Sequence, residues 1–288
     1  MTDRVDVRKT YKLFVGGAFP RSESGRTYQA LDSKGCFVAN MARASRKDAR
    51  DAVVAARKAL AGWSARTPYN RGQILYRVAE MIEGRREQFV SEVAAGEGLS
   101  RSRATTAVDV AIDRWVWYAG WADKLAQVTG SANAVSGPYF NFSLPEPTGV
   151  VAVLAPQRSS LLGLVSVLAP AIVSGNTVVA VSSHARPVPS VTLSEVLATS
   201  DLPAGVVNVL TGDAAEVGPW LASHQDVNAI DLVGADEPEL ALALEVAAAG
   251  NLKRVLRHTG NVDWMRDPGI SRMTAYLETK SVWHPIGI

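Results

Sequence analysis

The stretch PEPTGVVAVLAPQRSSLLGLVSVLAPAIVSGNTVVAVSSHARP, residues 145–187, decides the fold. It holds two apolar runs of strand length, Val150–Ala155 and Thr177–Val181, with a longer helical pattern between them at Ser160–Val173. A strand, a crossover helix and a second strand form the unit from which parallel sheets are built. The stretch therefore predicts the beginning of an α/β sheet.

The same alternation continues downstream. Strand-length apolar runs recur at 206–210, 229–233 and 254–257, and helical patterns at 188–200, 214–222 and 238–249. Five runs with intervening helices favour a Rossmann-type open, mostly parallel sheet with helices on both faces. We therefore expect an α/β fold.

The upstream half is mostly helical. Ser45–Asp48 has capping-box spacing and begins a helix that ends near Trp63. Thr67-Pro68 begins a second helix, expected to extend toward Ala95, and a third covers roughly 103–125 with its aromatic residues on a buried face. Residues 12–18 are predicted as a short strand, and the segment from there to about Ala44 as irregular.

Composition and charge exclude several classes of protein. Of 288 residues, 47% are hydrophobic and 20% charged, which suffices for a large core. A net charge of +2 gives no reason to expect a nucleic acid or an anionic membrane as partner. The longest apolar run, Leu161–Val173, is too short to span a bilayer. Since Cys36 is the single cysteine and no metal-ligand spacing occurs, we expect no disulfide and no metal site, in a soluble cytoplasmic protein.

The end of the sequence departs from the alternating pattern. Tyr139–Leu144 is predicted as a strand ended by Pro145 and Pro147. This strand precedes the run of strands and helices described above, and from about Asp263 the alternating pattern no longer continues.

Residues 145–187 resemble the core of the NAD(P)-dependent aldehyde dehydrogenases. The match includes Ala169–Ala171 and Gly175–Val179, and residues 275–288 resemble the Lys-[ST]-V-W strand at the end of that family. The resemblance implies that this last strand pairs with the 139–147 region in a β oligomerisation flap. It further implies a Rossmann-type domain over 1–262, interrupted by flap strands at about 137–148, and a linker with an oligomerisation strand over 263–288.

The polar groups of the family pattern are replaced. Gln157 and Arg158 stand where the family has Trp-Asn, and Val181 and His184 where it has the ribose-binding lysine and glutamate. His258, in His258-Thr-Gly260-Asn261, stands where it has the glutamate base. We expect Arg158 and His258 to be surface residues.

The nucleophile is missing from its family position. The resemblance places the cysteine-bearing substrate domain between the His258 motif and the last strand, where this sequence continues directly into its tail. Cys36 lies far upstream and is expected to be a small buried or half-buried residue. We therefore predict no catalytic residue, an absent substrate domain and a chain that is inactive alone.

The glycines of the family's dinucleotide site survive better. Gly212 and Gly218 follow one predicted strand, and Gly234 follows the next. Glycines at such turns are weak signals, because the turn itself requires them. Because both ribose-binding side chains are replaced, we predict vestigial cofactor-binding residues and no bound cofactor, NAD or NADP being the weaker alternative.

Residues 8–28 and 281–288 resemble the degenerate second unit of aldehyde dehydrogenase family 16. The resulting hypothesis is a pseudoenzyme that assembles with a full-length aldehyde dehydrogenase or with itself. The alternative is an NAD(P)-binding subunit of an aldehyde oxidoreductase whose nucleophile comes from another chain. A remnant without a role is a third reading, against which the intact alternation of strands and helices weighs.

Overall fold

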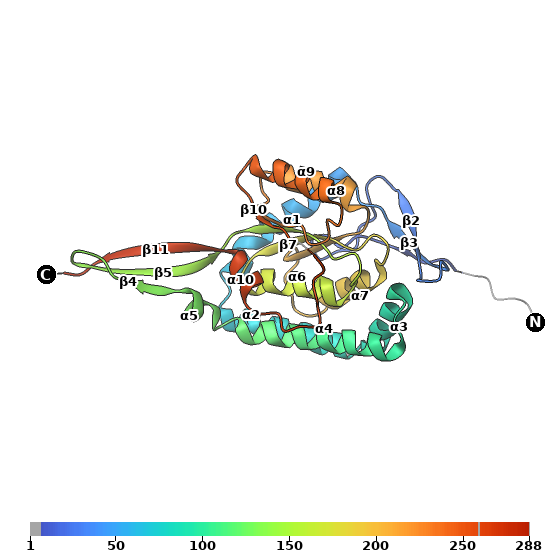
Figure 1. Cartoon of the computed structure of the whole chain (residues 1–288), viewed down its shortest axis with the longest axis horizontal. Coiled ribbons are helices and arrows are strands. Elements are labelled where there is room, and N and C mark those ends of the chain that lie inside the picture. The colour runs from blue at the N-terminus through green and yellow to red at the C-terminus, as the bar shows by residue number, and fades with distance from the viewer. Residues whose placement is uncertain (1–6, 259, 288) are drawn as a thin grey trace, which may run out of the picture.

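The computed structural model describes residues 7–258 and 260–287, so that Met1–Asp6, Thr259 and Ile288 lie outside the description. A layered α/β body carries a small sheet near its N-terminal end and a long β flap that projects from the opposite end (Figure 1). The central sheet contains β6 (Val150–Leu154), β7 (Thr177–Val181), β8 (Val207–Leu210), β9 (Ala229–Asp231) and β10 (Arg254–Leu256).

The central sheet confirms the predicted parallel α/β fold. Its strand order is β10-β9-β6-β7-β8, and every neighbouring pair is parallel. The chain proceeds from β6 to one edge and then returns to add β9 on the other side of β6. The sheet therefore has a topological switch point between β6 and β9, where open α/β sheets bind ligands.

Alternating side chains of the central strands divide the core in two. Val151 and Val153 of β6 pack on one side of the sheet, and Val150 and Leu154 on the other. The first side is covered by α2 (Pro68–Glu83), α3 (Arg86–Glu97), α4 (Arg101–Trp121), α6 (Leu162–Val173) and α7 (Val188–Leu197). The second is covered by α1 (Arg46–Ser64), α8 (Ala214–Ser223) and α9 (Pro238–Ala249). Burial on both faces explains why the strands are continuously apolar rather than alternating.

The helical upstream half follows the sequence prediction with one correction. Ser45 caps α1 in a capping box with Asp48, as its spacing predicted. The helix that begins after Thr67 does not extend toward Ala95; it ends at Glu83, and α3 begins at Arg86. Gly84, a weak helix former, lies at the break.

The N-terminal segment contains more strand than predicted. β1 (Thr10–Tyr11), β2 (Thr27–Leu31) and β3 (Phe37–Ala42) form a three-stranded sheet, and β2 and β3 lie in the segment predicted to be irregular. The predicted strand over 12–18 is wrong, since only isolated bridges occur there, one of them joining Phe14 to Val209 of β8. The small and polar residues of β2 and β3 gave no clear period-two pattern.

The flap is an antiparallel sheet of β4 (Ser131–Asn133), β5 (Tyr139–Pro147) and β11 (Leu277–Pro285), in the order β11-β5-β4. The pairing of β5 with β11 runs without interruption from Tyr139↔Pro285 to Pro147↔Leu277. The prediction that Pro145 and Pro147 end the strand is wrong. Both prolines lie beyond the part of β5 that pairs with β4, so their missing N–H groups disturb no ladder on that edge.

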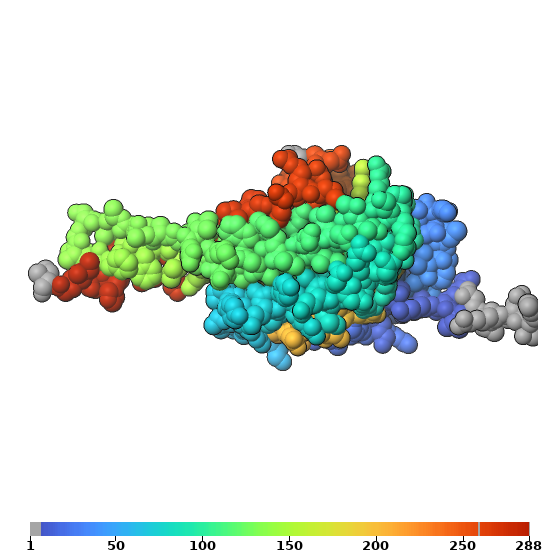
Figure 2. Space-filling view, turned by 90° about the horizontal axis from the view of Figure 1, so that it is seen from below, coloured from blue at the N-terminus to red at the C-terminus, as the bar shows by residue number. Residues whose placement is uncertain are grey.

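Figure 2 shows the flap extending well beyond the body, with β11 lying along β5. A short helix, α5 (Leu125–Thr129), leads into it, and α10 (Ser271–Ala275) precedes β11. Within the described part of the chain, no helix has the length and apolar character needed to cross a bilayer.

Candidate functional site

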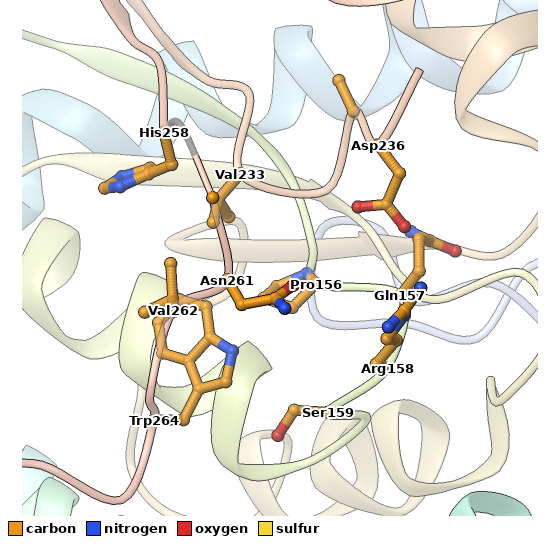
Figure 3. A pocket seen from close by; sticks show the side chains of 12 residues that line it. Pro156, Gln157, Arg158, Ser159, Val233, Asp236, His258, Asn261, Val262 and Trp264 are labelled. Atoms are coloured by element: carbon orange, nitrogen blue, oxygen red, sulfur yellow. The ribbon is translucent and has the colours of Figure 1, made fainter. Parts of the chain in front are cut away.

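A cleft of about 480 Å³ opens at the switch point of the central sheet. Its walls are the loop after β6, the loop after β9 and the segment after β10, all at the carboxyl ends of their strands. Figure 3 shows Gln157, Arg158 and Asp236 on one side of the cleft and His258, Asn261 and Trp264 on the other. The position and size of the cleft are those of a small-molecule site in an open α/β fold.

The first helix after β6 has its N-terminus occupied by the protein's own carboxylate. Glu97 Oε1, at the end of α3, accepts hydrogen bonds of 2.7 Å from both the backbone N–H and the hydroxyl of Ser160. Ser159 Oγ accepts a bond of 3.0 Å from the N–H of Gly163 in the same turn. Helix N-termini attract phosphate groups. A dinucleotide phosphate at this turn would therefore have to compete with Glu97.

The helix on the other side of the switch point begins among acidic residues. Asp236 and Glu237 precede Pro238, the first residue of α9, and Glu239 follows it. Their negative charges interact favourably with the positive end of the helix dipole, and they would repel a pyrophosphate that approached it. Arg158 is the exposed cation of the cleft wall that could hold a phosphate. The cleft therefore lies where a dinucleotide would bind. Its charges match a dinucleotide only in part, because Arg158 would attract the pyrophosphate and the acidic residues around Pro238 would repel it.

Two of the three predicted glycines lie at turns, Gly234 after β9 and Gly212 after β8, and Gly218 lies within α8. Gly234 lies between cleft residues Val233 and Ala235, and a Cβ there would stand 2.0 Å from the carbonyl oxygen of Ala155. Gly212 follows β8 with a φ of +141°, and Gly218 packs within α8 against Leu244. Close packing and backbone conformation are enough to explain these glycines. Their presence is therefore not evidence for a phosphate site.

Gln157 and His184, which replace polar residues of the family pattern, contact each other and neighbouring residues beside the cleft. Gln157 accepts a 3.0 Å bond from the N–H of His184 and donates a 2.8 Å bond to the carbonyl of Ala155. The ring of His184 stacks on Tyr28 at a centroid distance of 4.5 Å, while Val181 is fully buried. Arg158 is exposed, as predicted. These contacts link the loops after β6 and β7, where the family pattern has cofactor contacts.

His258 lies on the wall of the cleft and is exposed, as predicted. Its Nε2 is 2.7 Å from Nη2 of Arg272, which forms an ion pair with the fully buried Asp231. Tyr276 donates a 2.8 Å bond to the same carboxylate. Partial burial and the positive charge of Arg272 lower the pKa of His258. These two effects favour the neutral imidazole, while the negative charge of Asp231 opposes them.

Cys36 lies in the turn between β2 and β3 and is exposed, so the prediction of a buried or half-buried residue is wrong. Asp32 Oδ1 shapes that turn by accepting bonds from the N–H groups of Lys34 and Cys36. Cys36 is not among the residues that line the cleft. Among the described residues, no cluster of His, Cys, Asp and Glu could hold a metal ion.

Sequence reasoning missed the residues that organise this site from a distance. Glu97 ends a helix and Arg272 lies in the tail, and neither carried a motif. Asp231 offered the one available signal, because it is an acidic residue in an otherwise apolar strand. A buried charge in such a position requires a partner. The sequence did not reveal that the partner would be Arg272.

Comparison with known proteins identifies a family. The profile of the aldehyde dehydrogenase family matches residues 21–263. The chain is 30% identical to an aldehyde dehydrogenase of Davidiella tassiana over 96% of its own length and 54% of that protein. It is 32% identical to aldehyde dehydrogenase family 2 member B4 of Arabidopsis thaliana over 86% of its length and 46% of that protein.

The fold resembles solved structures of the same kind. The crystal structure of PnpE in complex with nicotinamide adenine dinucleotide superimposes with a TM-score of 0.79 at 28% identity, covering 85% of this chain and 50% of that one. The chain thus spans about half the length of the relatives it matches. Because a similar structure binds NAD, the comparisons give no support to the prediction of no cofactor. They give no indication of family 16 or of a non-catalytic unit.

Proposed function

Because the chain belongs to the aldehyde dehydrogenase family, we propose that it acts as a non-catalytic assembly subunit, pairing with a full-length member of that family or with a second copy of itself. The projecting flap is the observation that carries this proposal. The finer assignment, to the degenerate second unit of family 16, rests on the residue patterns at 8–28 and 281–288 and is part of the same proposal.

The flap has the properties of a surface that joins another chain. Phe140 is 50% exposed and Trp283 is 58% exposed, although both lie within paired strands. Tyr139 and Trp283 also form an edge-to-face pair with centroids 5.7 Å apart. The outer edge of β11 presents unpaired backbone groups along its length, and such an edge is a template for sheet extension. Large exposed aromatic side chains on a rigid sheet favour a protein partner.

The cleft supports the non-catalytic part of the proposal. Aldehyde oxidation requires a thiolate to attack the carbonyl and a base within reach. The only cysteine, Cys36, lies in the β2–β3 turn, and residues 257–276 connect β10 directly to the flap. His258, the residue at the family's base position, is engaged with Arg272. We infer that any oxidoreduction would need groups from another chain.

Light scattering of the purified chain, alone and mixed with a full-length aldehyde dehydrogenase from the same host, tests assembly. We expect an oligomer or a mixed complex, weakened at least tenfold by Trp283→Asp, since a central tryptophan typically contributes strongly to an interface. Leu252→Asp is the matched control, because Leu252 is 91% exposed on the body rather than the flap. A stable monomer that never co-elutes with the enzyme would end the proposal.

Dinucleotide binding is a second candidate function, favoured by the position of the cleft at the switch point. Arg158, the loop after β9 and Asn261 would hold the cofactor, which would supply hydride transfer when bound. The experiment is a thermal denaturation series with NAD⁺ and NADP⁺ up to millimolar concentration, because a ligand that binds the folded state raises the melting temperature. An unchanged melting temperature with both would exclude this candidate and leave the assembly proposal untouched.

A further inference from the structure

A second pocket, of about 400 Å³, lies on the other side of the segment after β10. It is lined by α4, α6, α10 and the tail, and shares His258, Asn261 and Trp264 with the cleft at the switch point. Its inner wall contains Arg114 and Tyr118, which lie one turn apart on α4. Neither residue belongs to the motifs that resemble the family or to the flap of the proposed assembly.

Arg114 is a buried cation without a carboxylate partner among the described residues. The residue is 5% exposed, and it donates to neutral acceptors: Ser166 Oγ at 3.1 Å and the carbonyls of Trp264 and Arg266 at 2.7 and 2.9 Å. These three bonds are made by Nη1 and Nη2, and none of the acceptors carries a charge. A buried charge is normally paired, because desolvation otherwise disfavours it. The lowered pKa of Arg114, which burial causes, has the same origin.

Tyr118 provides a second, independent observation. Its side chain is fully buried, and its hydroxyl has no hydrogen-bond partner within the described residues. Burial raises the pKa of this hydroxyl to about 12, so it remains a donor across the physiological range. Buried hydroxyl groups usually have a partner, and an orphan one points to a group that binds there. The pocket therefore places an unused hydroxyl donor, Tyr118, one helical turn from a buried cation, Arg114, that forms no ion pair with a described carboxylate.

We propose that this pocket binds a small organic monocarboxylate, whose two oxygens accept hydrogen bonds from Arg114 and Tyr118. Trp264, Val262 and Pro268 supply an apolar wall for the body of the ligand. The exposed carboxylates of Asp263 and Asp267 at the same pocket disfavour a dianion. Because Tyr118 is buried, binding includes an outward shift of the wall segment 262–268, which contains no helix or strand.

Of the other charged groups around the pocket, Asp267 attracts Arg114 electrostatically without forming an ion pair, and its exposed position lets solvent screen that attraction. Arg272 pairs with Asp231 and contacts His258, and its guanidinium lies 5.3 Å from the ring centroid of Trp264. Arg266 is exposed to solvent, which screens its charge. Arg114 is thus the cation that a ligand carboxylate would neutralise. Such binding requires neither assembly nor a dinucleotide, so its outcome is independent of the proposed function.

Thermal denaturation and calorimetric titration of the purified full chain with sodium benzoate test this proposal, against sodium chloride and inorganic phosphate at matched ionic strength. We expect saturable stabilisation by benzoate and none by the other two salts. Tyr118→Phe removes a hydroxyl that has no partner among the described residues, so it should fold normally and bind benzoate roughly tenfold or more weakly.

Tyr28→Phe is the matched control, because Tyr28 also has a buried hydroxyl without a partner in the described chain but lies beside His184, away from this pocket. It should bind benzoate as the parent chain does. Equal stabilisation by benzoate and chloride would overturn the proposal and leave Arg114 as a structural clamp on the tail. Equal benzoate affinity of the parent and Tyr118→Phe, or binding of phosphate in place of benzoate, would overturn it too.

Discussion

Replacing Arg272 by methionine should detach the tail from the central sheet. Arg272 lies in α10 and forms an ion pair with Asp231, the last residue of β9. The side chain of Asp231 is fully buried and that of Arg272 is 11% exposed. If one of the two side chains is removed, water cannot easily reach the charge of the other. Methionine retains much of the volume of arginine and removes its charge, which isolates the loss of the ion pair.

The expected cost follows from what remains around the carboxylate. Removing one partner of a buried pair costs about 3–5 kcal/mol, because the other charge is left without compensation. Tyr276 still donates to Oδ2 at 2.8 Å and the N–H of Val233 to Oδ1 at 3.0 Å. These two bonds stabilise the remaining charge, so we expect a decrease of about 3 kcal/mol in the free energy of unfolding, at the lower end of that range.

Urea unfolding followed by tryptophan fluorescence and circular dichroism measures this decrease. The matched control is Arg257→Met, since Arg257 forms an ion pair with Glu245 in which the side chains are 38% and 29% exposed. An exposed pair contributes about 1 kcal/mol or less. If Arg272→Met were no more destabilising than Arg257→Met, the idea that a buried charge anchors the tail would be refuted.

Three further predictions concern the walls of the cleft. Gly234→Ala should destabilise the fold by about 3 kcal/mol or more, since its Cβ would stand 2.0 Å from the carbonyl oxygen of Ala155; a melting temperature within a degree or two of the parent would contradict this. Glu97→Gln should cost about 1–3 kcal/mol in urea unfolding, because it weakens two bonds from Ser160 to a charged oxygen, whereas an unchanged midpoint would show that the carboxylate charge is unimportant there. The pKa of His258 is lowered in the folded chain, so its contribution to stability is present above the unfolded value of 6.5 and is lost as the pH falls through the lower folded pKa. The stability difference between the parent and His258→Gln should therefore change as the pH falls below the unfolded value of 6.5, and an NMR titration of His258 at or above 6.5 would disprove the shift.

The candidate site was predictable from the sequence only in outline. Gln157, Arg158 and Gly234 in the loops after β6 and β9 were located through the family resemblance, the first two as replaced positions and Gly234 as a vestigial cofactor-binding residue. The burial of Cys36 was predicted wrongly, since the average behaviour of cysteine does not describe a residue in a tight exposed turn. Glu97 is separated from Ser160 by 63 positions in the sequence, and no local pattern connects them.

The sequence by itself determined the elements whose signal is local. A few neighbouring residues are enough to predict these elements. Examples are the continuous apolar runs of β6 and β7, the capping box at Ser45 and the proline after Thr67. Burial on both faces leaves such strands no polar positions, which is why the parallel sheet could be recognised.

Only the tertiary structure decided how distant polar groups would be satisfied. The partner of Asp231 is Arg272, and the partner of Ser160 is Glu97. Within the described chain, Arg114 bonds only neutral acceptors and the Tyr118 hydroxyl has no partner, both at the edge of a pocket. Hydrogen bonds and ion pairs depend on distances of a few ångströms, and those distances are fixed when the helices pack. The hydrophobic pattern of the sequence determines how the helices pack, but it does not indicate which charged side chains that packing brings together.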